Sequence, residues 1–139
     1  MKIIFQTGEL NVEKVLASFT SKNDNSGAVI SFLGKVRPSR NKKKIKSMDI
    51  EIYEEMALYQ TKIAIRSLLK KFKIHDYLII HRYGNLKPGE IIIFVVVASE
   101  HRKEGFTFIQ DIVLYFKKKI TFWKKENYAQ YSKWLDRQI

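Results

Sequence analysis

The chain has 139 residues, of which 45% are hydrophobic and 13% aromatic, and it contains no cysteine. A chain of this length is expected to form one domain over residues 1–139, with a proper core rather than a disordered tail. The missing cysteines exclude disulfides, thiolate metal sites and a cysteine nucleophile. A net charge of +12 favours anionic partners such as nucleic acid, phosphorylated metabolites or acidic protein surfaces.

Neither a secretory signal nor a membrane span is expected. The first ten residues, MKIIFQTGEL, turn polar after a short apolar stretch, unlike a signal peptide. The longest apolar run, residues 91–98, is far shorter than the ~20 residues that a transmembrane helix needs. These features predict a cytoplasmic protein with no membrane partner.

The first 38 residues predict the order strand, helix, strand. Residues 2–6 read as a short strand, and residues 28–35 as a second strand that Pro38 stops. Between them, Asn11 is a suitable N-cap for an amphipathic helix. That helix has apolar residues at the i, i+3, i+4, i+7 spacing, namely Val12, Val15, Leu16 and Phe19.

The middle of the chain begins with a basic segment, RNKKKIK at residues 40–46, which we expect to be a mobile loop or a hairpin tip. Met48, Ile50 and Ile52 then alternate with polar residues, as in a half-buried strand. A helix over residues 55–72 follows, with an apolar stripe of Leu58, Ile65, Leu68, Leu69 and Phe72.

The next segments predict two more strands joined by a turn. Residues 77–82 form the first strand, and Pro88-Gly89 suits a turn because proline presets φ and glycine accepts a positive φ. Residues 91–98 are apolar without alternation, so both faces of this strand should be covered.

Ser99 is the predicted cap of a last helix, which should run to about Lys118. Its inward stripe is predicted to be Phe106, Ile109, Val113 and Phe116. An aromatic C-terminal segment completes the order β-α-β-β-α-β-β-α-β, which predicts an α+β fold with a mixed sheet.

Several common functional motifs are incomplete or missing. Gly34-Lys35 lacks the preceding glycine and the following hydroxyl residue of a phosphate-binding loop, since Val29 and Val36 occupy those positions. No dinucleotide fingerprint or GxSxG serine motif occurs. The three histidines are His75, His81 and His101, and their spacing does not predict a zinc site.

Four segments place cationic side chains where an anion could bind. At a helix start, the free backbone N–H groups and the helix dipole also favour a phosphate. The segments are Lys35-Val36-Arg37 at a strand end, His101-Arg102 at the helix start, Lys117 in its last turn, and Lys124-Lys125-Glu126 after Phe122-Trp123.

Each segment, taken singly, has a plainer explanation. Lysines 117–119 could complement the negative helix C-terminus, and His101-Arg102 could be surface residues of a first helical turn. Lys35 and Arg37 could be flanking charges of a strand, and large aromatic residues most often belong to the core. Their joint order and spacing are more informative.

Five segments together match a known family. They are Gly27-Ala28-Val29 leading to Phe32-x-Gly34-Lys35-Val36-Arg37; Glu51-x-Tyr53 with Met56; His81-Arg82-x-Gly84-x-Leu86-x-Pro88-Gly89; Ser99-x-His101-Arg102 then Phe106; and Lys117 followed by Phe122-Trp123-Lys124-Lys125-Glu126, with Trp134 near the end. In this order they resemble the molybdopterin synthase catalytic (large) subunit family over nearly the whole chain.

The resemblance implies an α/β hammerhead fold and a sulfurtransferase activity in molybdenum cofactor biosynthesis. It implies a homodimer within a heterotetramer, with a small ubiquitin-like sulfur-carrier subunit at each end. The thiocarboxylated Gly-Gly tail of that subunit would enter a pocket and pass sulfur to cyclic pyranopterin monophosphate, forming the dithiolene of molybdopterin. It implies no metal or other cofactor at this step.

The resemblance also implies which residues form the site. Lys117 is the expected main catalytic residue and Lys124 its helper, for proton transfer or charge stabilisation. A phosphate ester suits guanidinium and imidazole groups, and crowding by other cations would lower the pKa of a lysine. The expected substrate-binding residues are Lys35, Val36, Arg37, His101, Arg102, Lys117, Lys124, Lys125 and Glu126.

Four positions depart from the pattern of that family. Ile52 stands where a histidine is common, Glu54-Glu55 where Pro-Gly is frequent, and Thr121 where proline is usual. We interpret these departures as local changes to packing and turns, since the candidate lysines are kept.

Two alternatives belong to other classes. The charge and the RNKKKIK segment would also suit a nucleic-acid-binding module, whose affinity should fall steeply as salt rises. A non-catalytic scaffold for a ubiquitin-like partner is the second, and a turnover assay would distinguish it.

Overall fold

Two four-stranded sheets, one hairpin and three helices make up the computed structural model, which describes residues 1–136. The elements in chain order are β1 (Lys2–Gln6), α1 (Val12–Lys22), β2 (Ala28–Lys35), β3 (Ser39–Arg40), β4 (Lys43–Lys44), β5 (Ser47–Ile52), α2 (Glu54–Lys71), β6 (Ile74–Arg82), β7 (Gly84–Leu86), β8 (Ile91–Ser99), α3 (Arg102–Lys118), β9 (Phe122–Asn127) and β10 (Ser132–Trp134).

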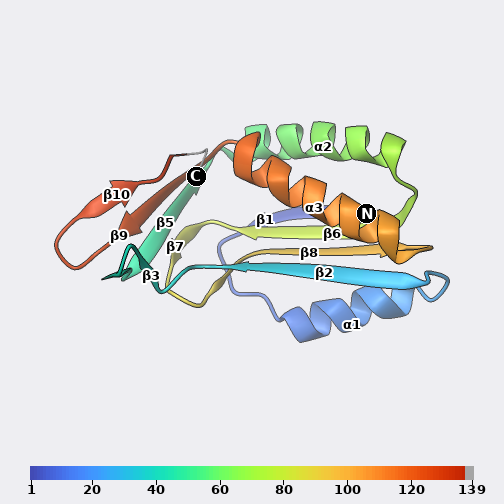
Figure 1. Ribbon diagram of the computed structural model, residues 1–139, viewed down its shortest axis with the longest axis horizontal. Coiled ribbons are helices and arrows are strands. Elements are labelled where there is room, and N and C mark those ends of the chain that lie inside the picture. Colours follow the sequence, from blue (N-terminus) through green and yellow to red (C-terminus); the bar gives the residue numbers. More distant parts are fainter. Residues whose placement is uncertain (137–139) are drawn as a thin grey trace.

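The larger sheet has the strand order β1-β6-β8-β2. β1 is parallel to β6, whereas β8 is antiparallel to both β6 and β2. Helix α1 covers one face of this sheet, and α2 and α3 cover the other (Figure 1). The α+β class with a mixed sheet is therefore confirmed.

Strand β8 is the centre of the core, which explains its unbroken apolar sequence. Phe94, Val96 and Ala98 pack with Phe19 of α1, on one face of the sheet. Alternate residues, such as Val95, face the cluster that α2 and α3 contribute to. Both faces are covered, as the lack of alternation predicts.

The smaller sheet, of order β10-β9-β5-β7, lies at one end of the larger sheet (Figure 1). The chain passes from the large sheet to the small one between β6 and β7, across a single residue. Met48 and Ile50 of β5 are buried, as their alternation with polar residues predicts. The junction of the two sheets is where the candidate site lies.

Two local predictions, a helix cap and a turn, are confirmed. The Oδ1 atom of Asn11 accepts a hydrogen bond from the backbone N–H of Lys14 at 3.0 Å, so Asn11 caps α1. Gly89 has a φ of 86°, and the Glu90 N–H donates to the carbonyl of Lys87, which closes the predicted Pro-Gly turn.

The basic segment 40–46 forms a hairpin, which is one of the two structures expected for it. Strands β3 and β4 pair around Asn41 and Lys42, whose φ angles of 51° and 67° suit a tight two-residue turn. Ile45 is buried and its N–H donates to the carbonyl of Pro38. This apolar residue fastens the base of the hairpin to the core.

Two predictions for helix α3 are wrong. Ser99 does not cap the helix, because it still pairs with Ala28 at the end of β8, and His101 occupies the N-cap position. Phe106 is 59% exposed rather than inward-facing. The helix turns Gly105 toward the sheet instead, where an added Cβ would meet the side chain of Ile30.

Helix α2 buries a different set of residues from the one that its apolar pattern predicts. Ile65 and Leu68 are buried as predicted, together with three small residues that the pattern missed: Ala57, Thr61 and Ala64. The other predicted stripe residues are half-buried: Leu58, Leu69 and Phe72. Within residues 1–136, none of the helices combines the length and hydropathy needed to span a bilayer.

Gly27, just before β2, marks a close approach of two backbone segments. A Cβ at this position would overlap the backbone carbonyl of Glu100. Replacing Gly27 with Ala should lower the free energy of unfolding by about 1–3 kcal/mol, because a backbone atom cannot move aside cheaply. Urea unfolding monitored by tryptophan fluorescence measures this change.

Gly8 provides the matched control, since nothing lies within 4 Å of a Cβ built there. Gly8→Ala should change the free energy of unfolding by no more than about 0.5 kcal/mol. Equal stability of the two variants would contradict the close approach at Gly27.

Candidate active site

A cavity of about 250 Å³ opens between the end of the large sheet, the last turns of α3 and strand β9. Its apolar wall includes Phe32, Ile93, Phe116 and Phe122. Among residues 1–136, five cationic ones also line it: Lys35, Arg37, Arg40, Lys117 and Lys124. Asp136 is the one carboxylate among the described lining residues, so the cavity favours an anionic ligand.

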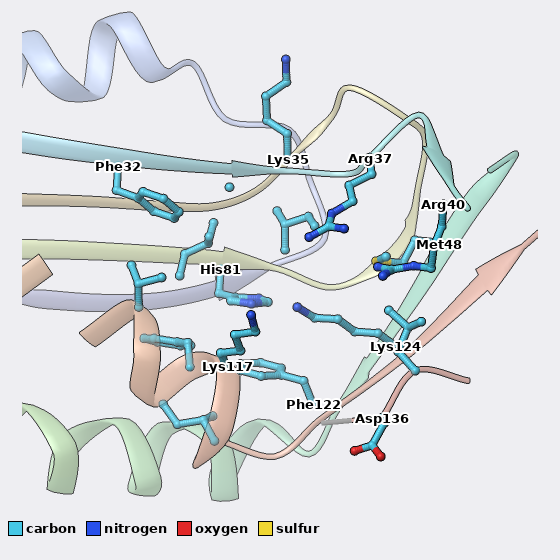
Figure 2. Close-up of a pocket in the computed structure, with 17 residues that line it drawn as sticks. Phe32, Lys35, Arg37, Arg40, Met48, His81, Lys117, Phe122, Lys124 and Asp136 are labelled. Atoms are coloured by element: carbon cyan, nitrogen blue, oxygen red, sulfur yellow. The ribbon is translucent and has the colours of Figure 1, made fainter. Parts of the chain in front are cut away.

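The two predicted catalytic lysines reach this cavity from different elements. Lys117 comes from the last turn of α3, and Lys124 from the middle of β9. Figure 2 shows their side chains converging on His81, while the guanidinium of Arg37 points into the same hollow from the opposite wall. The folded chain therefore brings Lys117, Lys124 and Arg37 together, as the sequence predicts.

His81 forms the floor of the cavity and is buried on β6. Its ring stacks on Phe122, with ring centroids 4.2 Å apart and planes 8° apart, and Phe116 stacks at 5.6 Å. Its Nδ1 lies 2.8 Å from the carbonyl oxygen of Arg82. Because a carbonyl only accepts, Nδ1 carries the proton, which leaves Nε2 as an unprotonated acceptor.

Burial and positive charge together keep this imidazole neutral. Burial, followed by the charge of Lys124, lowers the pKa of His81 to about 3, against the smaller opposing effect of its bond to Arg82. The ring is thus an uncharged surface between cations at physiological pH.

Lys124 is the more enclosed of the two lysines. Burial and then the nearby charge of Lys117 lower the pKa of Lys124 below its ordinary value. Lys117 itself is exposed at the rim of the cavity. The sequence-based expectation that cation crowding lowers the pKa of a lysine is met at Lys124.

The alternation of strand β9 decides which of its residues face the cavity. Phe122, Lys124 and Glu126 lie on the inner face, whereas Lys125 points to the other side. The Nζ of Lys125 lies 3.6 Å from an Asp49 oxygen and 5.4 Å from the Trp134 ring centroid. Lys125, a predicted substrate-binding residue, therefore does not line the cavity of this chain.

Glu126 is fully buried beside the cavity rather than in its wall. Its Oε1 accepts hydrogen bonds from the Nε of Arg40 and the hydroxyl of Tyr128, both at 2.7 Å. The hydrogen bond to Glu126 raises the pKa of Arg40. Partial burial and the same carboxylate raise the pKa of Tyr128 to about 12.

Two other predicted residues near β2 differ in position. Lys35 lines the cavity, but its ammonium points away from the other cations (Figure 2). Val36 is buried, and its backbone exchanges hydrogen bonds with Glu90 and Gly89. Val36 thus fixes the strand end and does not itself face the cavity.

His101 and Arg102 lie at the opposite end of α3 from Lys117. Lys117 lies fifteen positions after Arg102, which corresponds to roughly 22 Å along a helix at about 1.5 Å per residue. Both residues are exposed, and neither lines the cavity. This chain alone does not bring them to the other cations.

Sequence reasoning gave no role to several residues of the cavity, among them His81 and Arg40. His81 carried a signal, because it opens the third matched segment, but its isolation from other ligand-type residues gave it no assigned role. Arg40 was hidden in a basic segment that reads as a solvated loop. Their roles depend on the contacts described above, which no local pattern encodes.

The comparison with family models shows what kind of protein has this arrangement. Residues 5–119 match the family described as MoaE protein. The chain belongs to this family.

Curated relatives carry the name molybdopterin synthase catalytic subunit. One from Pyrococcus abyssi is 33% identical over 98% of this chain and 90% of its own length. Another, from Ralstonia nicotianae, is 32% identical over 96% of this chain and 76% of its own length. The resemblance noted from the five sequence segments is therefore confirmed.

Solved structures of the family share the fold. Molybdopterin synthase from Staphylococcus aureus aligns with a TM-score of 0.86 at 25% identity, covering 96% of both chains. The MoaE protein from Burkholderia ambifaria aligns with a TM-score of 0.83 at 26% identity, covering 99% of this chain and 90% of its own. The hammerhead-type α+β fold expected from the resemblance agrees with these structures.

The buried neutral state of His81 predicts a pH-dependent stability. The unfolded chain binds a proton at this histidine below about pH 6.5, but the folded chain does so only near pH 3, so stability falls as pH falls through this window. Between pH 6.5 and 5 the loss should be about 2 kcal/mol in the free energy of unfolding, measured with urea.

His81→Phe should flatten this slope, from a lower starting stability because the Arg82 carbonyl loses its donor. His75→Gln is the control, because His75 is exposed and its replacement should leave the slope unchanged. A slope that survives in His81→Phe would contradict the assignment.

The pKa of Lys124 should depend on Lys117. NMR titration of the lysine side chains should place the pKa of Lys124 below 10.5, and Lys117→Gln should raise it partway back, since burial remains. Lys118→Gln, an exposed neighbour on α3, should leave it unchanged. An identical Lys124 titration in all three proteins would show that the two lysines do not interact.

Proposed function

We propose that this chain is the catalytic subunit of a cytoplasmic sulfurtransferase of the molybdopterin synthase type. It transfers sulfur from the thiocarboxylated C-terminus of a small ubiquitin-like subunit to cyclic pyranopterin monophosphate. Two sulfurs are transferred in turn, one from each of two carrier tails, and water supplies the oxygen that turns each spent tail into a carboxylate. The products are the dithiolene of molybdopterin and two carrier tails in the carboxylate form. The observation that carries the proposal is the convergence of Lys117 and Lys124 on one cavity in a chain of this family.

The electrostatics of the cavity suit both reacting partners. The thiocarboxylate and the phosphate ester are anionic, and the cavity offers four cations whose side chains enter it. The chain contains no cysteine, so the sulfur must come from another molecule. Apolar walls around the charges strengthen their attraction for an anion.

The two lysines differ in a way that suggests separate roles. The lowered pKa of Lys124 raises its neutral fraction, which suits a proton acceptor during sulfur attack. Lys117, at the open rim, is placed to stabilise negative charge as the cyclic phosphate opens. His81 cannot serve as a cationic acid, since its pKa is about 3, but Nε2 can accept a hydrogen bond from a lysine.

The remaining predicted residues fit a site shared between two copies. His101 and Arg102 lie far from the cavity of their own chain, so we propose that a second copy in a homodimer supplies them. The small subunit would then bind at the other end of each copy, giving a heterotetramer. The proposal includes no metal or cofactor, and no group of three or more metal-ligating side chains occurs within residues 1–136.

Replacing Lys117 with Ala should reduce dithiolene formation by at least about a hundredfold, because the charge that stabilises the transition state is lost. The assay mixes the purified chain with thiocarboxylated small subunit and cyclic pyranopterin monophosphate. Binding of the small subunit, measured by calorimetry, should be unchanged, since Lys117 acts on the substrate.

Lys118→Ala is the matched control, because it removes the same charge one residue away on α3, outside the cavity. Its activity should stay close to that of the unmodified chain. A Lys117→Ala variant with full activity would remove Lys117 from the mechanism, and an unmodified chain that gives no product would overturn the proposed function.

A further inference from the structure

Arg40 enters the cavity from the β3–β4 hairpin, at a position that none of the five family-like segments includes. Its side chain is 20% exposed and lies against Glu126, which is fully buried. Figure 2 shows the guanidinium directed toward the hollow that Arg37 and Lys124 also face. A basic residue of an apparently solvated segment is thus turned inward.

The way in which Arg40 is held leaves one edge of its guanidinium available. Its Nε donates to Glu126 at 2.7 Å, and no hydrogen bond within residues 1–136 uses its two Nη groups. A guanidinium presents those two groups as a planar fork, which matches a pair of phosphate oxygens. The contact with Glu126 therefore orients the fork without occupying it.

Glu126 is itself arranged to hold one cation firmly. Tyr128 donates to the same Oε1 at 2.7 Å, and Oε2 has no hydrogen-bond partner within the described chain. A buried carboxylate with so few donors is costly unless a positive charge lies beside it. Arg40 is the cation that compensates it, so the hairpin is fastened to β9 at this point.

We propose that Arg40 binds the phosphate group of the substrate, and that Glu126 and Tyr128 position it for that purpose. This inference rests on the proposed function and adds a specificity residue to its site. Glu126, predicted from the resemblance to bind substrate, becomes a positioning residue that acts through Arg40. The hairpin then supplies a phosphate contact that lies outside the five family-like segments.

A purely structural role for Arg40 makes a different prediction. If Arg40 only neutralises Glu126, its loss should reduce the affinity for both ligands equally or leave both affinities unchanged. If the fork binds phosphate, only ligands that carry the phosphate should lose affinity. Two ligands separate these cases: cyclic pyranopterin monophosphate and a pterin of the same ring system without phosphate.

Arg40→Ala should weaken binding of the cyclic pterin phosphate by about ten- to a hundredfold, the range for charge-assisted hydrogen bonds, and leave the phosphate-free pterin unchanged. The affinity of Arg40→Lys for the cyclic pterin phosphate should lie between those of the unmodified chain and Arg40→Ala, because an ammonium keeps the charge but lacks the fork. Lys44→Ala is the control, since it removes one charge from the exposed side of the same hairpin. It should bind both ligands as the unmodified chain does.

Arg40→Ala leaves a buried carboxylate without its cation, which can impair folding. The double variant Arg40→Ala with Glu126→Gln removes that charge as well and keeps the test valid. Glu126→Gln alone should reduce the affinity for the cyclic pterin phosphate less than Arg40→Ala does. The double variant should bind this ligand no more weakly than Arg40→Ala, because the two residues act as one unit.

Unchanged affinity for the cyclic pterin phosphate in a folded Arg40 variant, or equal weakening for both ligands, would overturn the assignment. If those variants also turn over normally, the proposed function stands and only the role of Arg40 fails. Phosphate-selective loss of binding in a chain that transfers no sulfur gives the reverse result: the phosphate contact stands and the proposed reaction does not.

Discussion

Repulsion among like charges is the constraint on which this site depends. Lys117 and Lys124 approach one cavity from two elements, and Arg37 faces them across it. Such crowding opposes folding, and it persists because the apolar core on both faces of β8 fixes the elements that carry the charges. Burial, and after it the charge of a neighbouring lysine, lowers the pKa of both Lys124 and His81, so repulsion contributes to both shifts. An anion in the cavity would relieve this repulsion, so binding and stability are linked.

The alternation of side chains along strand β9 determines the geometry of the site. Phe122 stacks on His81, Lys124 enters the cavity, and Glu126 holds Arg40, all from one face of the strand. The register with β5 places Ile52, Ile50 and Met48 opposite these three residues. A shift of one residue would turn Lys125 inward and Lys124 outward, so the packing of the buried β5 residues also sets which lysine is enclosed.

The sequence predicts the elements of this fold well because their signals are local. The alternation in β5, the cap at Asn11 and the apolar run of β8 each depend on neighbours within a few residues. The failures at Ser99 and Phe106 arise from tertiary contacts: pairing with Ala28 extends β8, and the close approach of α3 to the sheet selects Gly105.

The cavity was predictable only in part, because tertiary contacts also decide which side chains enter it. Lys117, Lys124 and Arg37 were found through a family pattern, whereas Arg40 depends on Glu126, 86 residues away in the sequence. The resemblance predicts that both Lys124 and Lys125 bind substrate, but of these two only Lys124 lines the cavity. Which of two adjacent lysines enters a cavity is decided by strand register, and no composition or spacing reveals it.

The departure at Thr121 shows how such a site tolerates local change. Where the family usually has proline before the Phe-Trp pair, this chain has a residue with a backbone N–H, which needs a partner when half-buried. Gln60 of α2 supplies it: its Oε1 accepts from Thr121 N–H at 2.9 Å, and its Nε2 donates to the Thr121 hydroxyl at 3.2 Å. A proline would fix φ at this point by its ring. Here a pair of hydrogen bonds to α2 holds the entry to β9 instead, one residue before Phe122 and three before Lys124, so the strand that carries the site is secured by a different interaction.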